Sequence, residues 1–231
     1  MSNPTHNFTT VLFDLDGTLA DTAPDLAFTL NTVLEEQGLA ALSYASIRSH
    51  VSQGGAALIR LGFGEDLDVT SFQRLRNRFL KLYAAHICVN TRLFPEMDRV
   101  LTHIEDQGMK WGVVTNKQAW LTDPLMAALE LDQRASCIIS GDTTSERKPH
   151  PKPLLHACEV ANSLPQHCLY LGDDPRDIQA GNAAGMTTLV ARYGYIHADN
   201  SPEQWGADGI IDDITELLDW LRPAPASAVR V

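Results

Sequence analysis

Four short apolar runs in the second half of the chain each end in polar residues, at 111–115, 137–140, 168–172 and 188–191. Runs of this length that are apolar throughout are typical of strands buried on both faces of a parallel sheet. Helical patterns lie between and after these runs, at 120–131, 151–161, 175–184 and 214–221. This alternation predicts an α/β fold, a doubly wound parallel sheet with a Rossmann-like core.

The first strand is predicted at 10–14, and the next apolar run does not come until residue 111. That interval is too long for one crossover helix, and it contains apolar residues at helical spacing. They fall into two groups: Leu26, Leu30, Val33 and Leu34, then Phe72, Leu75, Phe79 and Leu82. We therefore expect an all-helical cap at 20–88, inserted into a Rossmann-like core made of 1–19 and 89–224.

The composition excludes several classes of partner. Hydrophobic residues make up 44% of the chain and charged residues 20%, which is an ordinary globular balance. The formal net charge is -11, so neither nucleic acid nor an anionic membrane is expected to bind. The same charge would repel a phosphorylated substrate, so a phosphate site in this chain needs a local cation.

Four cysteines (Cys88, Cys137, Cys158 and Cys168) lie far apart without the paired spacing of a metal site. That pattern favours a reducing compartment. The first ten residues contain no apolar signal core, and no apolar run approaches the length of a membrane span. We expect a cytoplasmic monomer or homodimer. The Pro/Ala-rich residues 225–231 are expected to form a flexible tail.

Chemically active side chains follow the predicted strands at the points where the strands end. In an open parallel sheet these ends meet at one edge, where ligands bind. The side chains are carboxylates, a hydroxyl, an amide and an ammonium: Asp14 and Asp16 after the first strand, Thr115 and Asn116 after the second, Lys148 after the third, and Asp173, Asp174 and Asp177 after the fourth.

Crowded carboxylates raise one another's pKa unless a cation neutralises them, and oxygen-rich sites suit Mg²⁺. Together with Lys148, the metal would supply the positive charge that a phosphate requires. An aspartate can attack phosphorus and form an aspartyl-phosphate, while a second carboxylate protonates the leaving oxygen. Asp14 and Asp16 fit this pair because residues two apart on an extended chain point the same way. The pattern predicts a Mg²⁺-dependent phosphatase for a small phosphate ester.

The same positions resemble the four motifs of the haloacid dehalogenase-like superfamily of hydrolases. The matches are DLDGTLADT at 14–22, VTN at 114–116, Lys-Pro at 148–149 and GDDPRD at 172–177. The resemblance covers nearly the whole chain. The insertion at 20–88 looks like the cap domain of the phosphoglycolate phosphatase-like branch.

This resemblance implies a role for each matching position. Asp14 would be the nucleophile and a Mg²⁺ ligand, and Asp16 would be the acid/base and offer a backbone carbonyl to the metal. Asp173 would also ligate Mg²⁺. The remaining positions would bind or support the phosphoryl group: Thr115 and the Asn116 amide would hold it, Lys148 would neutralise it, and Asp174 and Asp177 would support metal-bound water and Lys148.

Within this branch, WGVVTNK at 111–117, RYGYIH at 192–197 and WGAD at 205–208 look like N-acetylmuramic acid 6-phosphate phosphatases of cell-wall recycling. That resemblance implies N-acetylmuramic acid 6-phosphate as substrate, with 2-phosphoglycolate as the alternative.

In the cap, two glycines break a helical pattern, which indicates a loop. By analogy with related caps, this loop is expected to recognise the leaving group. Its residues are Ser52, Gln53, Gly54 and Gly55. A plain interhelical loop is the alternative. Asp21 and Asp25 are expected to cap the first helix of the insertion.

Two other functions share part of this pattern. A phospho-accepting signalling domain also combines aspartates, Thr or Ser, and Lys on a doubly wound sheet, but its acidic pair precedes the phosphorylated aspartate. Here the pair Asp173 and Asp174 comes last. A sugar phosphomutase has all four motifs, and this alternative stays open. A dehalogenase would lack the second aspartate, so Asp16 argues against that activity.

Overall fold

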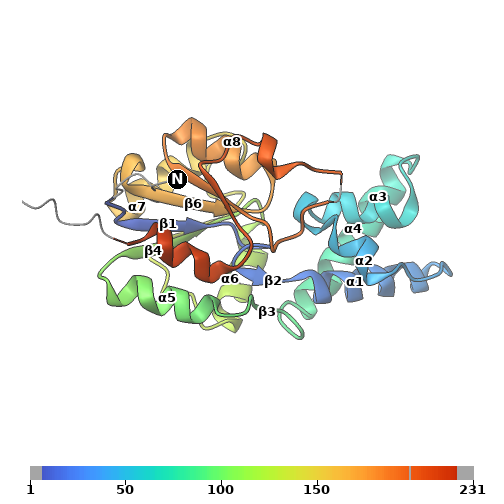
Figure 1. Ribbon diagram of the computed structural model, residues 1–231. Coiled ribbons are helices and arrows are strands. Elements are labelled where there is room, and N and C mark those ends of the chain that lie inside the picture. Colours follow the sequence, from blue (N-terminus) through green and yellow to red (C-terminus); the bar gives the residue numbers. More distant parts are fainter. Residues whose placement is uncertain (1–6, 198, 223–231) are drawn as a thin grey trace, which may run out of the picture.

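The computed structural model describes residues 7–197 and 199–222. Its centre is a six-stranded sheet in the order β5-β4-β1-β6-β7-β8, with parallel pairing throughout (Figure 1). The strands are β1 Thr10–Phe13, β4 Lys110–Val114, β5 Ile138–Ile139, β6 Cys168–Gly172, β7 Thr187–Ala191 and β8 Gly209–Ile211. The predicted doubly wound parallel sheet is confirmed.

Helices cover both faces of the sheet, with α5 and α8 on opposite sides in Figure 1. These core helices are α5 Met97–Asp106, α6 Ala119–Ala128, α7 Lys152–Ala161 and α8 Pro175–Ala184. Successive side chains of a strand point to opposite faces. Val11 and Phe13 therefore pack in the same cluster as residues of α5 and α6, while Leu12 packs with residues of α7 and α8.

The C-terminal part of the core differs from the predicted pattern. The sequence did not indicate β8, because its run of three residues is too short to show a period. The single helix expected at 214–221 is a 3-10 turn, Ile214–Glu216, followed by α9 Leu217–Trp220. Asp213 begins the turn by accepting a hydrogen bond from the Thr215 N–H. The tail expected at 225–231 lies outside the described residues.

Helices fill the interval after β1, as the sequence predicts, and they lie beyond one end of the sheet in Figure 1. They are α1 Ala23–Glu36, α2 Tyr44–Arg48, α3 Gly55–Phe63 and α4 Val69–Ala85. These helices share a hydrophobic cluster that includes Leu30, Leu58 and Phe79. That shared cluster supports our proposal to treat 20–88 as a cap. None of the described helices is long and apolar enough to cross a membrane.

The chain enters and leaves the helical region through two short antiparallel strands, β2 Ala20–Asp21 and β3 Arg92–Leu93. Near this crossing, the fully buried Asp25 carboxylate accepts hydrogen bonds from the backbone N–H groups of Asn90 and Thr91. The expected capping role of Asp25 is therefore wrong, because it ties α1 to the returning chain. The cap position of α1 is Thr22, whose side chain makes no capping hydrogen bond.

Candidate active site

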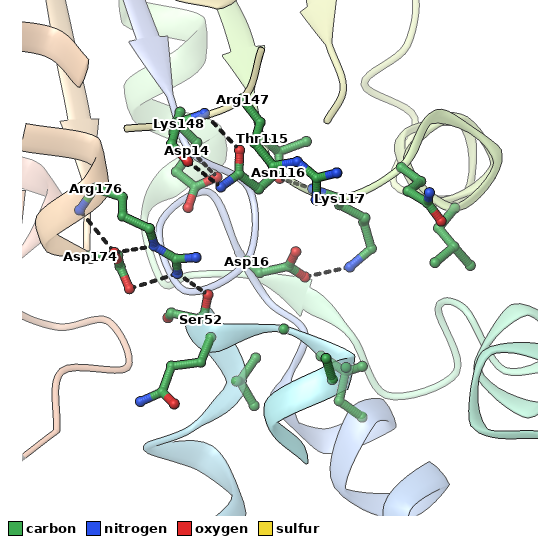
Figure 2. Close-up of a pocket in the computed structure, with 18 of the residues that line it drawn as sticks. Asp14, Asp16, Ser52, Thr115, Asn116, Lys117, Arg147, Lys148, Asp174 and Arg176 are labelled. Atoms are coloured by element: carbon green, nitrogen blue, oxygen red, sulfur yellow. Dashed lines mark hydrogen bonds and ion pairs between the residues drawn. The ribbon is translucent and has the colours of Figure 1, made fainter. Parts of the chain in front are cut away.

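A cavity of about 320 Å³ lies between the carboxyl ends of the strands and the helical cap. In Figure 2, Asp14, Thr115 and Lys148 lie on the strand side of this pocket and Ser52 lies on the cap side. Of the residues predicted to form the site, all except Asp173 line the cavity: Asp14, Asp16, Ser52, Gln53, Gly54, Gly55, Thr115, Asn116, Lys148, Asp174 and Asp177. The structure thus brings together side chains from four strand ends and one cap loop.

The Lys148 ammonium is buried between two carboxylates. Its Nζ lies 2.8 Å from Oδ1 of Asp14 and 2.8 Å from Oδ1 of Asp177. It also donates to the carbonyl oxygen of Val114 and to the Tyr170 hydroxyl. Burial alone would lower the pKa of Lys148, but the two carboxylates outweigh burial and raise it. Lys148 therefore carries its charge inside the pocket.

Asp14, Asp173 and Asp177 form a buried acidic cluster whose carboxylate oxygens lie within 4.8 Å of one another. Burial raises the pKa of Asp14 to about 7, against the opposing charge of Lys148. Burial, followed by the charge of Asp14, raises the pKa of Asp173 to about 8. Buried carboxylates with raised pKa values are stabilised in their charged form by a nearby cation. A divalent cation with a preference for oxygen ligands fits this set of donors.

Asp16 lies opposite this cluster, where two donors hold its carboxylate. Oδ1 accepts hydrogen bonds of 2.6 Å from the Lys117 ammonium and 2.6 Å from the Thr22 hydroxyl. Lys117 is itself buried, and its ammonium lies 4.8 Å from the centre of the Tyr83 ring. Burial alone would lower the pKa of Lys117, but the charge of Asp16 outweighs burial and raises it. The expected metal contact of the Asp16 backbone carbonyl stays a prediction.

The side chains of Thr115 and Asn116 have different surroundings. Asn116 makes two hydrogen bonds with the backbone of Lys148: Nδ2 donates to the carbonyl oxygen, and Oδ1 accepts from the N–H, each at 3.0 Å. Its side chain thus positions the loop that carries Lys148. The Thr115 hydroxyl accepts a hydrogen bond from the Lys117 N–H. The hydroxyl donates no hydrogen bond to any of the described residues, so its proton can be donated to a phosphoryl oxygen. Phosphate binding by both residues stays a prediction.

Asp174 begins α8, where it accepts a hydrogen bond from the Arg176 N–H in a capping box with Asp177. Its carboxylate also binds Nε of Arg176 at 2.7 Å. Arg176 in turn donates from Nη2 to the carbonyl oxygen of Ser52 in the cap (Figure 2). Asp174 therefore orients a guanidinium that holds the cap loop.

The same cap loop also reaches the acidic cluster, because the Ser52 hydroxyl donates to Oδ2 of Asp173 at 2.8 Å. Asp173 accepts two further hydrogen bonds, from the Thr18 hydroxyl and from the Tyr195 N–H. Gln53, Gly54 and Gly55 line the cavity without such contacts to the cluster. Recognition of the leaving group by residues 52–55 stays a prediction.

Gly17 is the position in the first motif that the geometry constrains most. Its φ of 86° lies in the left-handed region, and a Cβ there would meet Oδ2 of Asp173 at 2.3 Å. Glycine is required for both reasons. The tight turn places the backbone of the first motif against the carboxylate from the fourth.

The model of the family described as haloacid dehalogenase-like hydrolase matches residues 11–191 of the chain. That span begins in β1 and ends with β7. The chain belongs to this family. The resemblance seen in the four motifs is thereby confirmed.

Curated relatives and a solved structure extend the match. The chain is 42% identical to an N-acetylmuramic acid 6-phosphate phosphatase of Pseudomonas putida, over 90% of this chain and 93% of the relative. It is 40% identical to a phosphoglycolate phosphatase of Xanthomonas campestris, over 92% and 97%. A crystal structure described as a predicted phosphoglycolate phosphatase from Haemophilus somnus is 29% identical, with a TM-score of 0.84, and the match covers 94% of this chain and 99% of that one.

Several charged residues of the pocket were not predicted from the sequence. They are Arg76, Lys117, Arg147 and Arg176. Lys117 directly follows the second motif and Arg176 lies within the fourth. Their positions beside motif residues could therefore have indicated that both line the pocket. Nothing in the sequence distinguishes Arg76 from the other arginines of the helix at 69–85, because which face of the helix meets the pocket depends on the packing of the cap.

We predict that Gly17→Ala greatly reduces hydrolysis of an aryl phosphate, by about 100-fold or more, because the new Cβ displaces the Asp173 carboxylate. Gly38→Ala is the matched control, since Gly38 has a similar φ of 73° and a Cβ there would meet no atom within 4 Å. Both variants should lose about 1 kcal/mol or more of unfolding free energy from backbone strain. Equal activity of the two variants would contradict the prediction.

Proposed function

We propose that the chain is a Mg²⁺-dependent phosphatase that hydrolyses a small phosphate monoester through a phosphorylated Asp14. The observation that carries the proposal is the Asp14 carboxylate, which lines the pocket with its counter-charge Lys148 at 2.8 Å. Family membership and the names of the relatives support the same reaction class.

In the proposed reaction, an Asp14 oxygen forms a bond to phosphorus while the ester P–O bond breaks. For this step Asp16 must first carry a proton, which it gives to the leaving oxygen, so that the leaving group departs as an alcohol. Water then attacks the phosphorus of the aspartyl-phosphate, Asp16 takes a proton from that water, and Asp14 is regenerated. Lys148 neutralises the charge of the phosphoryl oxygens, and the Thr115 hydroxyl orients them by a hydrogen bond.

Asp14, Asp173 and the Asp16 backbone carbonyl would hold Mg²⁺, with Asp177 and Asp174 in supporting positions. The ion, when bound, supplies positive charge to the phosphoryl oxygens. The buried cluster fits this role because its donors are all oxygen atoms and because the pKa values of Asp14 and Asp173 are raised in the protein alone. Ser52 would support the same site through its hydrogen bond to Asp173.

For the substrate we propose N-acetylmuramic acid 6-phosphate. The cavity volume of about 320 Å³ lies within the roughly 300–1,000 Å³ of pockets that take drug-sized ligands. Its cap wall combines apolar side chains, such as Leu26 and Phe79, with the amide of Gln53. Such a wall suits the apolar faces and polar groups of a sugar. The relative from Pseudomonas putida bears the corresponding name.

The second candidate substrate is 2-phosphoglycolate, which the name of the Xanthomonas campestris relative favours. A cytoplasmic location and a monomeric or homodimeric state also remain parts of the proposal. The free thiols of Cys88, Cys137, Cys158 and Cys168 agree with a reducing compartment.

We predict that Asp14→Asn lowers Mg²⁺-dependent phosphate release from p-nitrophenyl phosphate by roughly 1,000-fold or more, because the amide is not a nucleophile. Circular dichroism should show an unchanged fold. The matched control is Asp123→Asn on the exposed surface of α6, which should retain full activity. Substantial phosphate release by Asp14→Asn would rule out the proposed mechanism.

We further predict that kcat/KM for N-acetylmuramic acid 6-phosphate exceeds that for 2-phosphoglycolate by about 10-fold or more, since only the larger ester fills the pocket. A phosphate-release assay with both esters measures this ratio. The reverse order would select 2-phosphoglycolate. Conversion of a sugar phosphate into its isomer without release of phosphate would select the phosphomutase alternative.

A further inference from the structure

The charged side chains that line the pocket do not all have partners. The four lining carboxylates are each paired with a cation: Asp14 and Asp177 with Lys148, Asp16 with Lys117, and Asp174 with Arg176. Two other arginines, Arg76 and Arg147, also line the pocket. Neither guanidinium makes an ion pair or a hydrogen bond with any residue in the described part of the chain. The pocket therefore holds two guanidinium groups that no carboxylate of the described residues neutralises.

The two unpaired arginines come from opposite walls. Arg147 directly precedes Lys148, and Figure 2 shows it on the side of the strand ends, near Asn116. Arg76 belongs to α4 in the cap. It shares a helix face with the other α4 residues that line the cavity, Phe79, Leu80 and Tyr83, because residues three, four and seven apart lie on one side of a helix.

Other arginines of α4 point elsewhere and have partners. Arg78 forms an ion pair with Glu36 of α1, and Arg74 donates to the side-chain oxygen of Gln37. Arg76 is half-buried at the end of an apolar stripe and faces the cavity. A half-buried guanidinium without an acceptor loses hydration, and an anionic ligand would compensate for that loss.

We propose that Arg76 binds a carboxylate on the leaving group, so that the substrates are phosphate monoesters that also carry a carboxylate. This inference rests on the proposed function, which places the phosphoryl group at Asp14 and Lys148 on the strand side. The leaving group then extends toward the cap wall, where Arg76 lies. Guanidinium and carboxylate are matched in charge and in their paired hydrogen-bonding geometry.

Both candidate substrates contain this second anion. N-Acetylmuramic acid 6-phosphate carries the carboxylate of its lactyl ether, and 2-phosphoglycolate is itself a carboxylic acid. A carboxylate-binding Arg76 would thus let one pocket accept either of the two esters after which the relatives are named. It also distinguishes the substrates from common sugar phosphates, which bear no carboxylate.

The test compares N-acetylmuramic acid 6-phosphate with N-acetylglucosamine 6-phosphate, which lacks the lactyl carboxylate. Arg76→Gln should lower kcat/KM for the first ester by about 10- to 100-fold, mainly through KM, and change the second by less than about twofold. Arg76→Lys should recover part of the loss because it restores the charge. Arg74→Gln removes the same charge from α4 outside the pocket, and it should leave both values unchanged.

An equal fall for both esters with Arg76→Gln would overturn the proposal, as would no fall for either. A selective fall with Arg147→Gln but not with Arg76→Gln would also overturn it. If the wild-type protein does not hydrolyse the muramic acid ester, the substrate proposal fails by itself. The same variants are then compared on 2-phosphoglycolate and on methyl phosphate, which has no carboxylate. If Arg76→Gln does not selectively lower kcat/KM for 2-phosphoglycolate, the proposed role of Arg76 is overturned. Hydrolysis that depends on Asp14 is a separate result and would still stand.

Discussion

A buried ammonium held between two carboxylates is the interaction on which the rest of the site depends. Lys148 lies 2.8 Å from both Asp14 and Asp177, and all three side chains are almost fully removed from water. Burying an ion in a protein costs several kcal/mol, so removal of Lys148 would leave two buried carboxylates without a counter-charge. The three residues come from different strand ends, and the sheet must therefore form before the charges can meet.

That arrangement also explains how a chain with a net charge of -11 can attract a phosphate ester. Although the chain as a whole is acidic, five cations converge on one cavity: Lys148, Lys117, Arg176, Arg76 and Arg147. A low local dielectric makes their field stronger inside the pocket than it would be in water. The pocket, rather than the whole surface, sets which ligands bind.

The core fold, and the gathering of the motif residues at one cavity, were predictable from the sequence because both follow local rules. Strands such as β1 and β6 are continuous apolar runs, and the residues after them converge at one edge of a parallel sheet. The partners of Asp25 and the position of Arg76 were not predictable in this way. Each depends on how the cap helices pack against the returning chain, and no local period or spacing encodes that packing.

The contacts of the cap loop also could not be predicted from the sequence. Ser52 was expected to read the leaving group, yet its hydroxyl donates to Asp173 and its carbonyl oxygen accepts from Arg176. A helix-breaking pair of glycines indicates a loop, but its contacts arise only when the cap lies over the strand ends. Recognition of the leaving group by residues 52–55 stays a prediction, and the proposed contact of Arg76 would add the wall of α4 to it.

The central claim, that Asp14 is phosphorylated during turnover, can be measured directly. The wild-type protein is mixed with substrate and Mg²⁺, quenched within one turnover and reduced with borohydride, which converts an aspartyl-phosphate into homoserine. Peptide mass spectrometry then locates the change. The account predicts homoserine at position 14, dependent on substrate. Homoserine at Asp16 or Asp173 instead, or an unmodified Asp14 in a quench that captures active turnover, would contradict it.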